Sequence, residues 1–404
     1  MLTLQQAWSV VLEYTPRLPA GEIATAEALG CVLAEPILAD RDLPPADRSA
    51  KDGFAVRAAD VRNAPVTLPV IGEVAAGSPA RPLVAEGACV RIFTGANLPA
   101  GADTVVTIES TREAGPGQVT FTVSESAGAN ILRRGENARQ GSELVPAGCV
   151  LGAIHIGLAA SAGRTTLRAF HKPRVALVTT GRELLDPGIP AGSHQERDAN
   201  GPMLAAAFTG AGFPIVGARR VSDDLEAITL ALRQSLATAD VVALSGGVSV
   251  GAYDFVPAAV TAVGARTLVH GVAMKPGKPF LFALAPQDRP IFGLPGNPLS
   301  AATGLHEFVL PALRRMSGWP ESDCRPLVRA RLREAVASKA GWQRCVLATL
   351  AWTASGCEVT PVPNRSSADL VAGARADGVL IVPEDAAGLD KGALVDFRPW
   401  RVWP

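Results

Sequence analysis

Strand-like and helix-like sequence alternates between residues 172 and 318, and this alternation restricts the fold more than any other feature. The strand-like runs are RVALVTTG, PIVGARRV, DVVALSGG and PIFGLPGNP, and the helix-like runs are PMLAAAFTGAG, LEAITLALRQSLATA and SAATGLHEFVLPALRRM. Such alternation is typical of βαβ units around a mostly parallel sheet, whose ligands bind at the carboxyl ends of the strands. We therefore expect a doubly wound α/β domain over residues 172–318.

The sequence before this domain predicts two further modules. Apolar residues recur at helical spacing in LQQAWSVVLEY, and a second helix-like run follows and ends near residue 32. Residues 42–139 consist of short β-rich runs cut by Gly and Pro, and residues 140–171 return to an Ala- and Gly-rich helix. We expect a helical linker module, residues 1–41 and 140–171, into which a β-rich domain, residues 42–139, is inserted.

The last part of the chain is again rich in strand-like sequence. Residues 319–404 contain the runs CVLATLAW, GCEVTPVP and GVLIVPE. We expect them to form a C-terminal domain that resembles a β-barrel.

The composition excludes several classes of protein. Hydrophobic residues make up 48% of the 404 residues and charged residues 19%, so intrinsic disorder is excluded. Because 38 basic residues balance 38 acidic ones, no bulk field attracts nucleic acid or an anionic membrane, and we expect neither as a partner. The six cysteines form no CxxC motif, and the first residues carry no export signal, which predicts a cytoplasmic protein.

The segment ALSGGVSVGAYD, residues 243–254, predicts a ligand-binding loop. Its glycines follow a buried strand and allow the backbone to approach an anion closely. The same segment contains a GxSxG pattern around Ser249, as in serine hydrolases. Gly246 and Gly247 already interrupt the strand, however, and no helical pattern begins before about Phe255, which argues against a nucleophile elbow.

Two further segments predict contacts with anions. MKPGKPF holds Lys275 and Lys278 on a loop stiffened by Pro and Gly, and two neighbouring ammonium groups favour an anion between them. A Walker loop is excluded because Pro279 replaces the required Ser or Thr. In GLPGNPLSAATGLHEF, Ser300 is expected to cap a helix whose N–H groups face a phosphate or oxyanion.

Carboxylates near glycines are candidates for binding a hard cation such as Mg²⁺, which needs few protein carboxylates when a substrate phosphate supplies other ligands. These carboxylates are Asp52, Glu136, Glu183, Asp198, Asp223, Asp224 and Asp254. The five histidines form no HExxH or HxH pattern, so a zinc site has little support.

Taken together, the motifs resemble those of a known family. The segments are SAKDGFAVR, VRIFTGANLPAGADTVV, NILRRGEN, VALVTTGREL, SGGVSVGAYD, MKPGKPF and FGLPGNPLSA. In this order they resemble the signatures of the molybdopterin molybdenumtransferase family, the MoeA proteins and the gephyrin E domain. The resemblance extends from the first helix to about residue 318 and continues weakly to the end.

The resemblance implies a four-module protomer that forms a homodimer, with the active cleft between the α/β module of one subunit and the β module of the other. The implied reaction inserts molybdate into adenylylated molybdopterin and releases AMP, with Mg²⁺ as cofactor. The substrate's own dithiolate attacks the metal oxyanion, so no covalent nucleophile is needed. Molybdopterin adenylyltransferase and molybdoenzyme apoproteins or their chaperones are the implied partners.

The resemblance and the carboxylate pattern together nominate site residues. Catalytic roles are expected for Asp52, Glu183, Asp254, Lys275 and Lys278. The expected metal ligands are Asp52, Glu136, Asp223 and Asp254. The residues expected to contact the molybdopterin substrate are Thr94, Gly246, Gly247, Ser249, Gly251, Pro295, Gly296, Asn297, Pro298, Ser300 and Ser367.

The chain departs from the family pattern at several positions. The family usually has Met at Lys51, Asp at Asn137, Asp at Arg182, and Thr-Asn-Arg at residues 199–201, where this chain has Ala-Asn-Gly. In the tail, the family's Gly-Arg-x-Glu-Phe-x-Arg corresponds to GWQRCVL, so Trp342 and Leu347 replace arginines that help to bind the oxyanion. A carrier or chaperone that binds molybdopterin without inserting metal therefore stays open beside the transferase.

Overall fold

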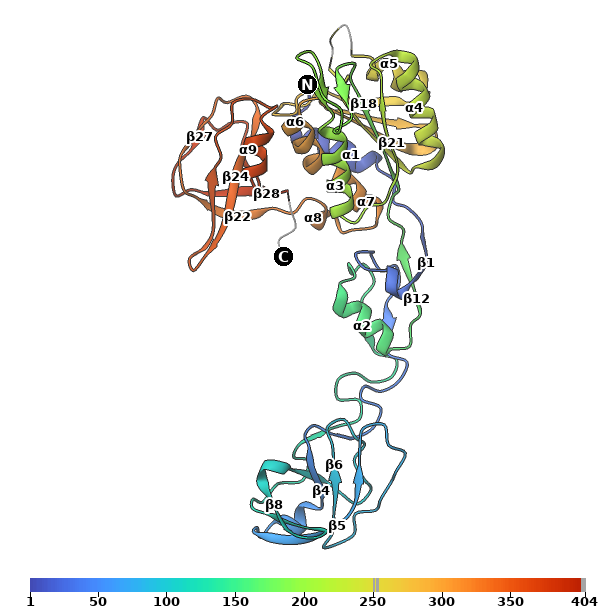
Figure 1. The fold of residues 1–404 in the computed structure, drawn as a ribbon, viewed down its shortest axis with the longest axis vertical. Helices are drawn as coiled ribbons and strands as arrows, with labels where there is room; N and C mark the ends of the chain where they lie inside the picture. Colours follow the sequence, from blue (N-terminus) through green and yellow to red (C-terminus); the bar gives the residue numbers. More distant parts are fainter. Residues whose placement is uncertain (250, 252–253, 401–404) are drawn as a thin grey trace. The chain divides into compact units, whose positions relative to one another are not determined.

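The computed structural model describes residues 1–249, 251 and 254–400. The chain divides into two compact units (Figure 1). Unit 1 comprises Met1–Ile23, Gly30–Ala34 and Arg168–Pro404, and unit 2 comprises Ala24–Leu29 and Glu35–Leu167. This division does not test the finer four-module boundaries, which stay a prediction.

A six-stranded, mostly parallel sheet forms the centre of unit 1, as the alternation predicts. Its order is β16 (Ile215–Val221), β13 (Val175–Thr180), β17 (Val241–Ser245), β21 (Arg289–Leu294), β20 (Leu281–Ala285) and β18 (Arg266–His270). β13 pairs in parallel with β16 and β17, and β17 does so with β21, whereas β20 runs antiparallel to both of its neighbours. The sequence does not predict β18, because its run RTLVH is short and half-exposed.

Helices cover both faces of this sheet, which confirms the doubly wound fold (Figure 1). The helices on one face are α1 (Leu4–Tyr14), α3 (Asn200–Gly210), α6 (Pro298–Gly304) and α7 (Leu310–Met316), and those on the other are α4 (Leu225–Thr238) and α5 (Val256–Ala262). Phe208, Phe292 and Phe308 are buried in the first core, and Leu232 and Val260 in the second.

The C-terminal part of unit 1 is a closed barrel, as expected. Its strands are β22 (Val328–Leu332), β24 (Gln343–Thr353), β25 (Gly356–Pro361), β26 (Gly378–Val382) and β28 (Leu394–Pro399). The ring closes because the long strand β24 pairs with both β25 and β26. A two-residue strand of the preceding domain, β19 (Met274–Lys275), also pairs in parallel with β24.

A buried ion-pair network lies where the helices of the α/β domain meet the barrel. Glu307 belongs to one π-helical turn, Leu305–Val309, between α6 and α7. Its Oε1 accepts a hydrogen bond from Arg398 Nε of β28 at 2.9 Å, and its Oε2 accepts one from Arg325 Nη2 at 2.6 Å. The Glu307 and Arg398 side chains are 0% and 4% exposed, so their charges are balanced inside the protein rather than by water.

Unit 2 is rich in strands, as predicted. Its six-stranded sheet has the order β7 (Thr104–Thr107), β4 (Gly53–Val56), β6 (Cys89–Ile92), β5 (Val66–Val74), β9 (Gln118–Phe121) and β8 (Thr111–Gly115). Phe54 and Phe121 meet edge to face in its core, with ring centroids 6.0 Å apart. The helix α2 (Ala153–Ser161) follows two short strand pairs.

The expectation of a second helix before residue 32 is wrong. After α1, Thr15 is extended and precedes Pro16, and a residue before proline disfavours the helical region. The chain then forms the strand β1 (Ala20–Ala24) and a short 3₁₀ turn, Thr25–Glu27.

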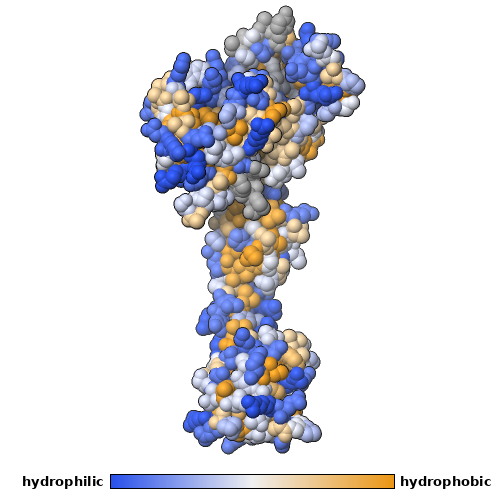
Figure 2. All heavy atoms as spheres, turned by 60° about the vertical axis from the view of Figure 1, so that its left-hand side comes forward, coloured by the Kyte–Doolittle hydropathy of each residue, from blue (hydrophilic) through white to orange (hydrophobic). Residues whose placement is uncertain are grey.

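Hydrophilic side chains cover much of the face shown in Figure 2, with apolar patches among them. Among the described residues, no helix combines the length and the apolar character that crossing a membrane requires.

Candidate functional site

A cavity of about 860 Å³ lies at the carboxyl ends of β13, β17 and β21 in unit 1, where ligands of parallel sheets bind. Carboxylates dominate its described charged lining, with one arginine among them, and we call it the acidic cavity. The charged residues are Glu183, Glu196, Asp198, Asp223, Asp254 and Arg197.

Side-chain hydrogen bonds join the strand ends that form this cavity. Thr179 Oγ1 donates to Asp198 Oδ2 at 2.7 Å, and Thr180 Oγ1 donates to Asp223 Oδ1 at 3.0 Å. The buried Asn200 donates from Nδ2 to Ser245 Oγ at 2.8 Å and to the Gly296 carbonyl at 2.7 Å. Both threonines end β13, so the positions of Asp198 and Asp223 follow directly from that strand.

The loop after β17 requires glycine. Gly246 has a φ of +100°, and a Cβ there would lie 2.2 Å from the Thr180 carbonyl oxygen. Gly251 donates its N–H to Asp254 Oδ2 at 2.8 Å, while residues 250, 252 and 253 lie outside the described residues. Ser249 is exposed, and α5 begins only at Val256, so Ser249 does not sit at the strand-to-helix elbow that a serine hydrolase needs.

Two nominated carboxylates, those of Glu183 and Asp254, act on a third, that of Asp223, in the acidic cavity. Burial raises the pKa of Asp223, and the Asp254 and Glu183 carboxylates raise it further, although the Thr180 hydrogen bond and Arg182 oppose them. A bound cation would relieve this repulsion, so the residues fit a Mg²⁺ ion. Because the described residues contain no cluster of three metal-ligating side chains, such an ion would take few protein ligands and complete its shell with substrate and water oxygens.

The other carboxylates of unit 1 have structural partners. Asp198 Oδ1 accepts the Gly201 N–H at 2.8 Å, and Asp224 caps α4 by accepting the Ala227 N–H at 2.8 Å. These two residues behave as turn and cap residues.

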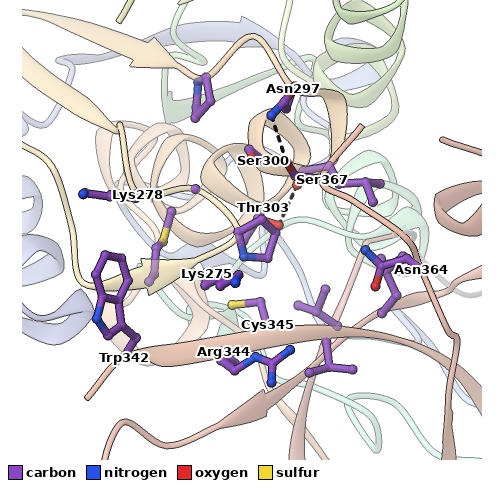
Figure 3. Close-up of a pocket in the computed structure, with 18 of the residues that line it drawn as sticks. Lys275, Lys278, Asn297, Ser300, Thr303, Trp342, Arg344, Cys345, Asn364 and Ser367 are labelled. Carbon is purple, nitrogen blue, oxygen red and sulfur yellow. Dashed lines mark hydrogen bonds between the residues drawn. The ribbon is translucent and has the colours of Figure 1, made fainter. Parts of the chain in front are cut away.

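A second cavity, of about 980 Å³, lies between the α/β domain and the barrel within unit 1 (Figure 3). It shares Pro279, Pro295 and Asn297 with the acidic cavity, so the two adjoin. No carboxylate belongs to its described lining, and we call it the cationic cavity. Its charged residues are Lys275, Lys278, Lys339, Arg344 and Arg365.

The predicted lysine pair lines the cationic cavity. Lys275 lies on β19 rather than in a loop, and the Lys278 ammonium lies 5.4 Å from the ring centre of Trp342 (Figure 3). Two other lining residues are joined by a hydrogen bond: Asn297 Nδ2 donates to Ser367 Oγ at 2.8 Å.

The expected helix cap at Ser300 is wrong. α6 begins at Pro298 with Asn297 at the N-cap, so Ser300 lies inside the first turn, where it lines the cationic cavity. Proline suits the first helical position because its fixed φ is helical and its missing N–H has no partner there.

The remaining nominated residues lie in unit 2. Asp52 Oδ1 accepts hydrogen bonds from the Thr94 N–H and Oγ1, each at 2.7 Å, and these bonds hold the pKa of Asp52 below its usual value. Glu136 Oε2 accepts the Arg133 N–H at 2.7 Å within a turn. Asp52 and Thr94 are thus hydrogen-bonded to each other, whereas Glu136 is hydrogen-bonded within its own turn.

Comparisons with known proteins agree over the whole length of the chain. Family models match residues 2–163 (MoeA N-terminal region, domains I and II), 176–315 (probable molybdopterin binding domain) and 329–400 (MoeA C-terminal region, domain IV). A molybdopterin molybdenumtransferase of Staphylococcus aureus is 33% identical over 402 residues, covering 98% of this chain and 95% of the relative. The chain belongs to the MoeA family.

Relatives and solved structures give the same result. A molybdopterin molybdenumtransferase of Staphylococcus epidermidis is 33% identical over 92% of this chain and 88% of its own length. A crystal structure of a MoeA protein from Pyrococcus horikoshii has a TM-score of 0.81 at 25% identity, covering 99% of this chain and 100% of that one. The similarity to MoeA proteins therefore extends over nearly the whole chain.

The structure shows where the departures from the MoeA pattern lie. Trp342 and Leu347 both line the cationic cavity, as the arginines of the family pattern would, and Arg344 lines it as well. The sequence reading missed Arg344, Arg365 and Lys339. One signal was present for Arg344: it lies in GWQRCVL, the same segment that holds Trp342 and Leu347.

One cysteine also belongs to the cationic cavity. Cys345 follows Arg344 on β24 and is buried. Burial raises the pKa of its thiol far above the ordinary value, and nearby Glu307 adds to this effect. Cys345 is therefore a neutral thiol at physiological pH.

Proposed function

We propose that this MoeA protein inserts molybdate into adenylylated molybdopterin and releases AMP in a Mg²⁺-dependent reaction. Family membership over the whole chain makes it a transferase of molybdenum cofactor biosynthesis. The observation that carries the finer proposal is the pair of adjoining cavities, one cationic and one acidic, which share Pro279, Pro295 and Asn297. A reaction that joins an oxyanion to a phosphate-linked substrate needs a cationic cavity for the oxyanion and an acidic cavity that can hold a cation at the phosphate linkage.

Each cavity suits one part of this reaction. In the cationic cavity, Lys275 and Lys278 would offset the charge of the molybdate dianion. In the acidic cavity, the glycine-rich loop after β17 would lie against the phosphate linkage, and Asp223 and Asp254 would hold Mg²⁺ together with substrate and water oxygens. The bound ion supplies positive charge that polarises this linkage.

The reaction itself provides the direct test. Purified protein with adenylylated molybdopterin and Mg²⁺ is expected to release AMP only when molybdate is added, and a chelator should stop the release. AMP release is measured by chromatography. Tight binding of the substrate with no molybdate-dependent AMP would contradict the proposal and favour the carrier.

We also propose that the protein works as a homodimer in the cytoplasm, with the cleft completed by Asp52 and Thr94 of a second copy. Molybdopterin adenylyltransferase would supply the substrate, and molybdoenzyme apoproteins or their chaperones would accept the product. Light scattering at micromolar concentration is expected to give the mass of a dimer, and a monomer would contradict the proposal.

Mixed dimers give a sharper test of the shared cleft. Asp52→Ala and Asp254→Ala proteins are each expected to be inactive, because each lacks one side of every site. Exchanging their subunits should restore about a quarter of wild-type AMP release, since half of the dimers are mixed and each holds one intact site. No recovery after verified exchange would place both residues in a site of one chain.

A further inference from the structure

Two cations stand directly opposite each other across a strand pair in the cationic cavity. Lys275 of β19 and Arg344 of β24 are register partners in a parallel pairing, and both line the cavity (Figure 3). Like charges directly opposite each other destabilise a sheet. Lys275 is exposed and Arg344 half-buried, so water screens part of this repulsion, and an anion bound between the two groups would relieve the rest.

The described residues supply no such anion. Neither Lys275 nor Arg344 forms an ion pair with a carboxylate in the part of the chain that the structure describes, and no carboxylate belongs to the cavity's described lining. Arg344 Nη1 donates to the Ala337 carbonyl at 3.0 Å, which uses one of the five donors of its guanidinium. This single bond anchors the side chain and leaves its positive charge uncompensated.

A third cation of the cationic cavity, Lys278, has a different kind of contact. The Lys278 ammonium lies 5.4 Å from the centre of the Trp342 ring, within the range of a cation–π contact. Trp342 therefore holds Lys278 without contributing a charge, and Lys275 and Arg344 remain as the adjacent pair of uncompensated charges.

We infer that Lys275 and Arg344 together clamp one tetrahedral oxyanion, and that Arg344 supplies the charge that Trp342 and Leu347 no longer provide. The inference rests on the proposed function for the identity of the anion, because molybdate and a substrate phosphate share the same tetrahedral chemistry. A guanidinium donates two parallel hydrogen bonds to such an anion, and an ammonium adds a point charge. Arg344 is thus a binding residue at a position where the family pattern has Glu.

Calorimetry with sodium molybdate and, separately, inorganic phosphate tests the clamp. Arg344→Ala is expected to bind the clamped anion about tenfold more weakly or worse, because it loses a hydrogen bond to a charged group. The affinity of Arg344→Lys should lie between those of Arg344→Ala and the wild type. Loss of molybdate binding alone identifies molybdate as the occupant, and loss of phosphate binding identifies the substrate phosphate. The matched control is Arg331→Ala, because Arg331 of β22 also donates Nη1 to a carbonyl at 3.0 Å but does not line the cavity.

Thermal melting adds a readout that separates binding from folding. Ligand-free Arg344→Gln should melt no lower than the wild type at low salt, because one of two repelling charges is gone, while the rise in Tm caused by the anion should shrink. Unchanged affinity in a folded Arg344→Ala protein, or no binding of either anion by the wild type, would overturn the clamp. Arg344-dependent binding without AMP release would instead contradict the proposed function and leave the clamp standing.

Discussion

Asp254→Ala is expected to slow molybdate-dependent AMP release by about a hundredfold to a thousandfold in a protein that still folds. Asp254 lies in the acidic cavity, where its charge raises the pKa of Asp223. Removing one electrostatic partner of a transition state typically costs this much in rate. Initial rates at saturating substrate measure the effect, and circular dichroism verifies the fold.

Two control variants separate charge from loop structure. Asp254→Asn keeps an acceptor for the Gly251 N–H, which lies 2.8 Å from the Asp254 carboxylate, but removes the charge, so it should be nearly as slow. Asp224→Ala removes the cap of α4 and should lower stability by about 1 kcal/mol while leaving the rate near wild type. A fully active Asp254→Asn protein would mean that Asp254 only shapes the loop.

Glu307→Ala is expected to lower the free energy of unfolding by about 3–5 kcal/mol, because Arg398 and Arg325 would keep charges in the interior with no carboxylate to balance them. Urea denaturation followed by tryptophan fluorescence measures the loss. The matched control is Asp396→Ala: its pair with Arg329 joins two barrel strands at 2.8 Å but is 36% and 59% exposed, so its loss should cost less than about 1 kcal/mol. Equal losses in the two variants would contradict the prediction.

The contribution of Glu307 to the free energy of unfolding should also depend on pH. Burial raises the pKa of Glu307, but Arg398 and Arg325 outweigh it and hold the pKa below its usual value. A depressed pKa in the folded state means that the stabilisation is fully present above the unfolded value of about 4.3 and is lost as the pH falls through the folded value. The difference in free energy of unfolding between the wild type and Glu307→Gln should therefore shrink only at acidic pH.

Local patterns were sufficient to predict the α/β domain. β13, β17 and β21 are continuous apolar runs followed by small or polar residues, so both the strands and the edge that binds ligands could be read from neighbouring residues. Two carboxylates of the acidic cavity could be predicted for the same reason, since Glu183 follows the end of β13 by three residues and Asp254 lies in the glycine-rich loop that follows β17. The second N-terminal helix was not formed because residues 20–24 pair as β1 with the distant strand β12 (Thr166–Phe170), a pairing that the local pattern does not show.

The barrel wall of the cationic cavity could not be predicted in this way. Arg344 reaches Lys275 only through the pairing of β19 with β24, and a two-residue strand carries no pattern that names its partner. The closure of β24 onto β26 is likewise a long-range pairing, set by the burial of apolar side chains inside the ring. The family pattern pointed to lost charge at Trp342 and Leu347, whereas the structure shows that the wall keeps its positive charge through different residues.

The buried thiol of Cys345 bears on how the cavity treats molybdenum. Metals are bound by thiolates, and a cysteine that stays protonated offers none. In the proposed reaction Cys345 would compete only weakly with the sulfur atoms of the substrate for the metal, because binding through this thiol would first require its deprotonation. Held by charge and hydrogen bonds alone, the oxyanion would exchange oxygen ligands, which leave as water, for the sulfur atoms of the incoming dithiolate, and the finished product would leave without a protein–metal bond to break.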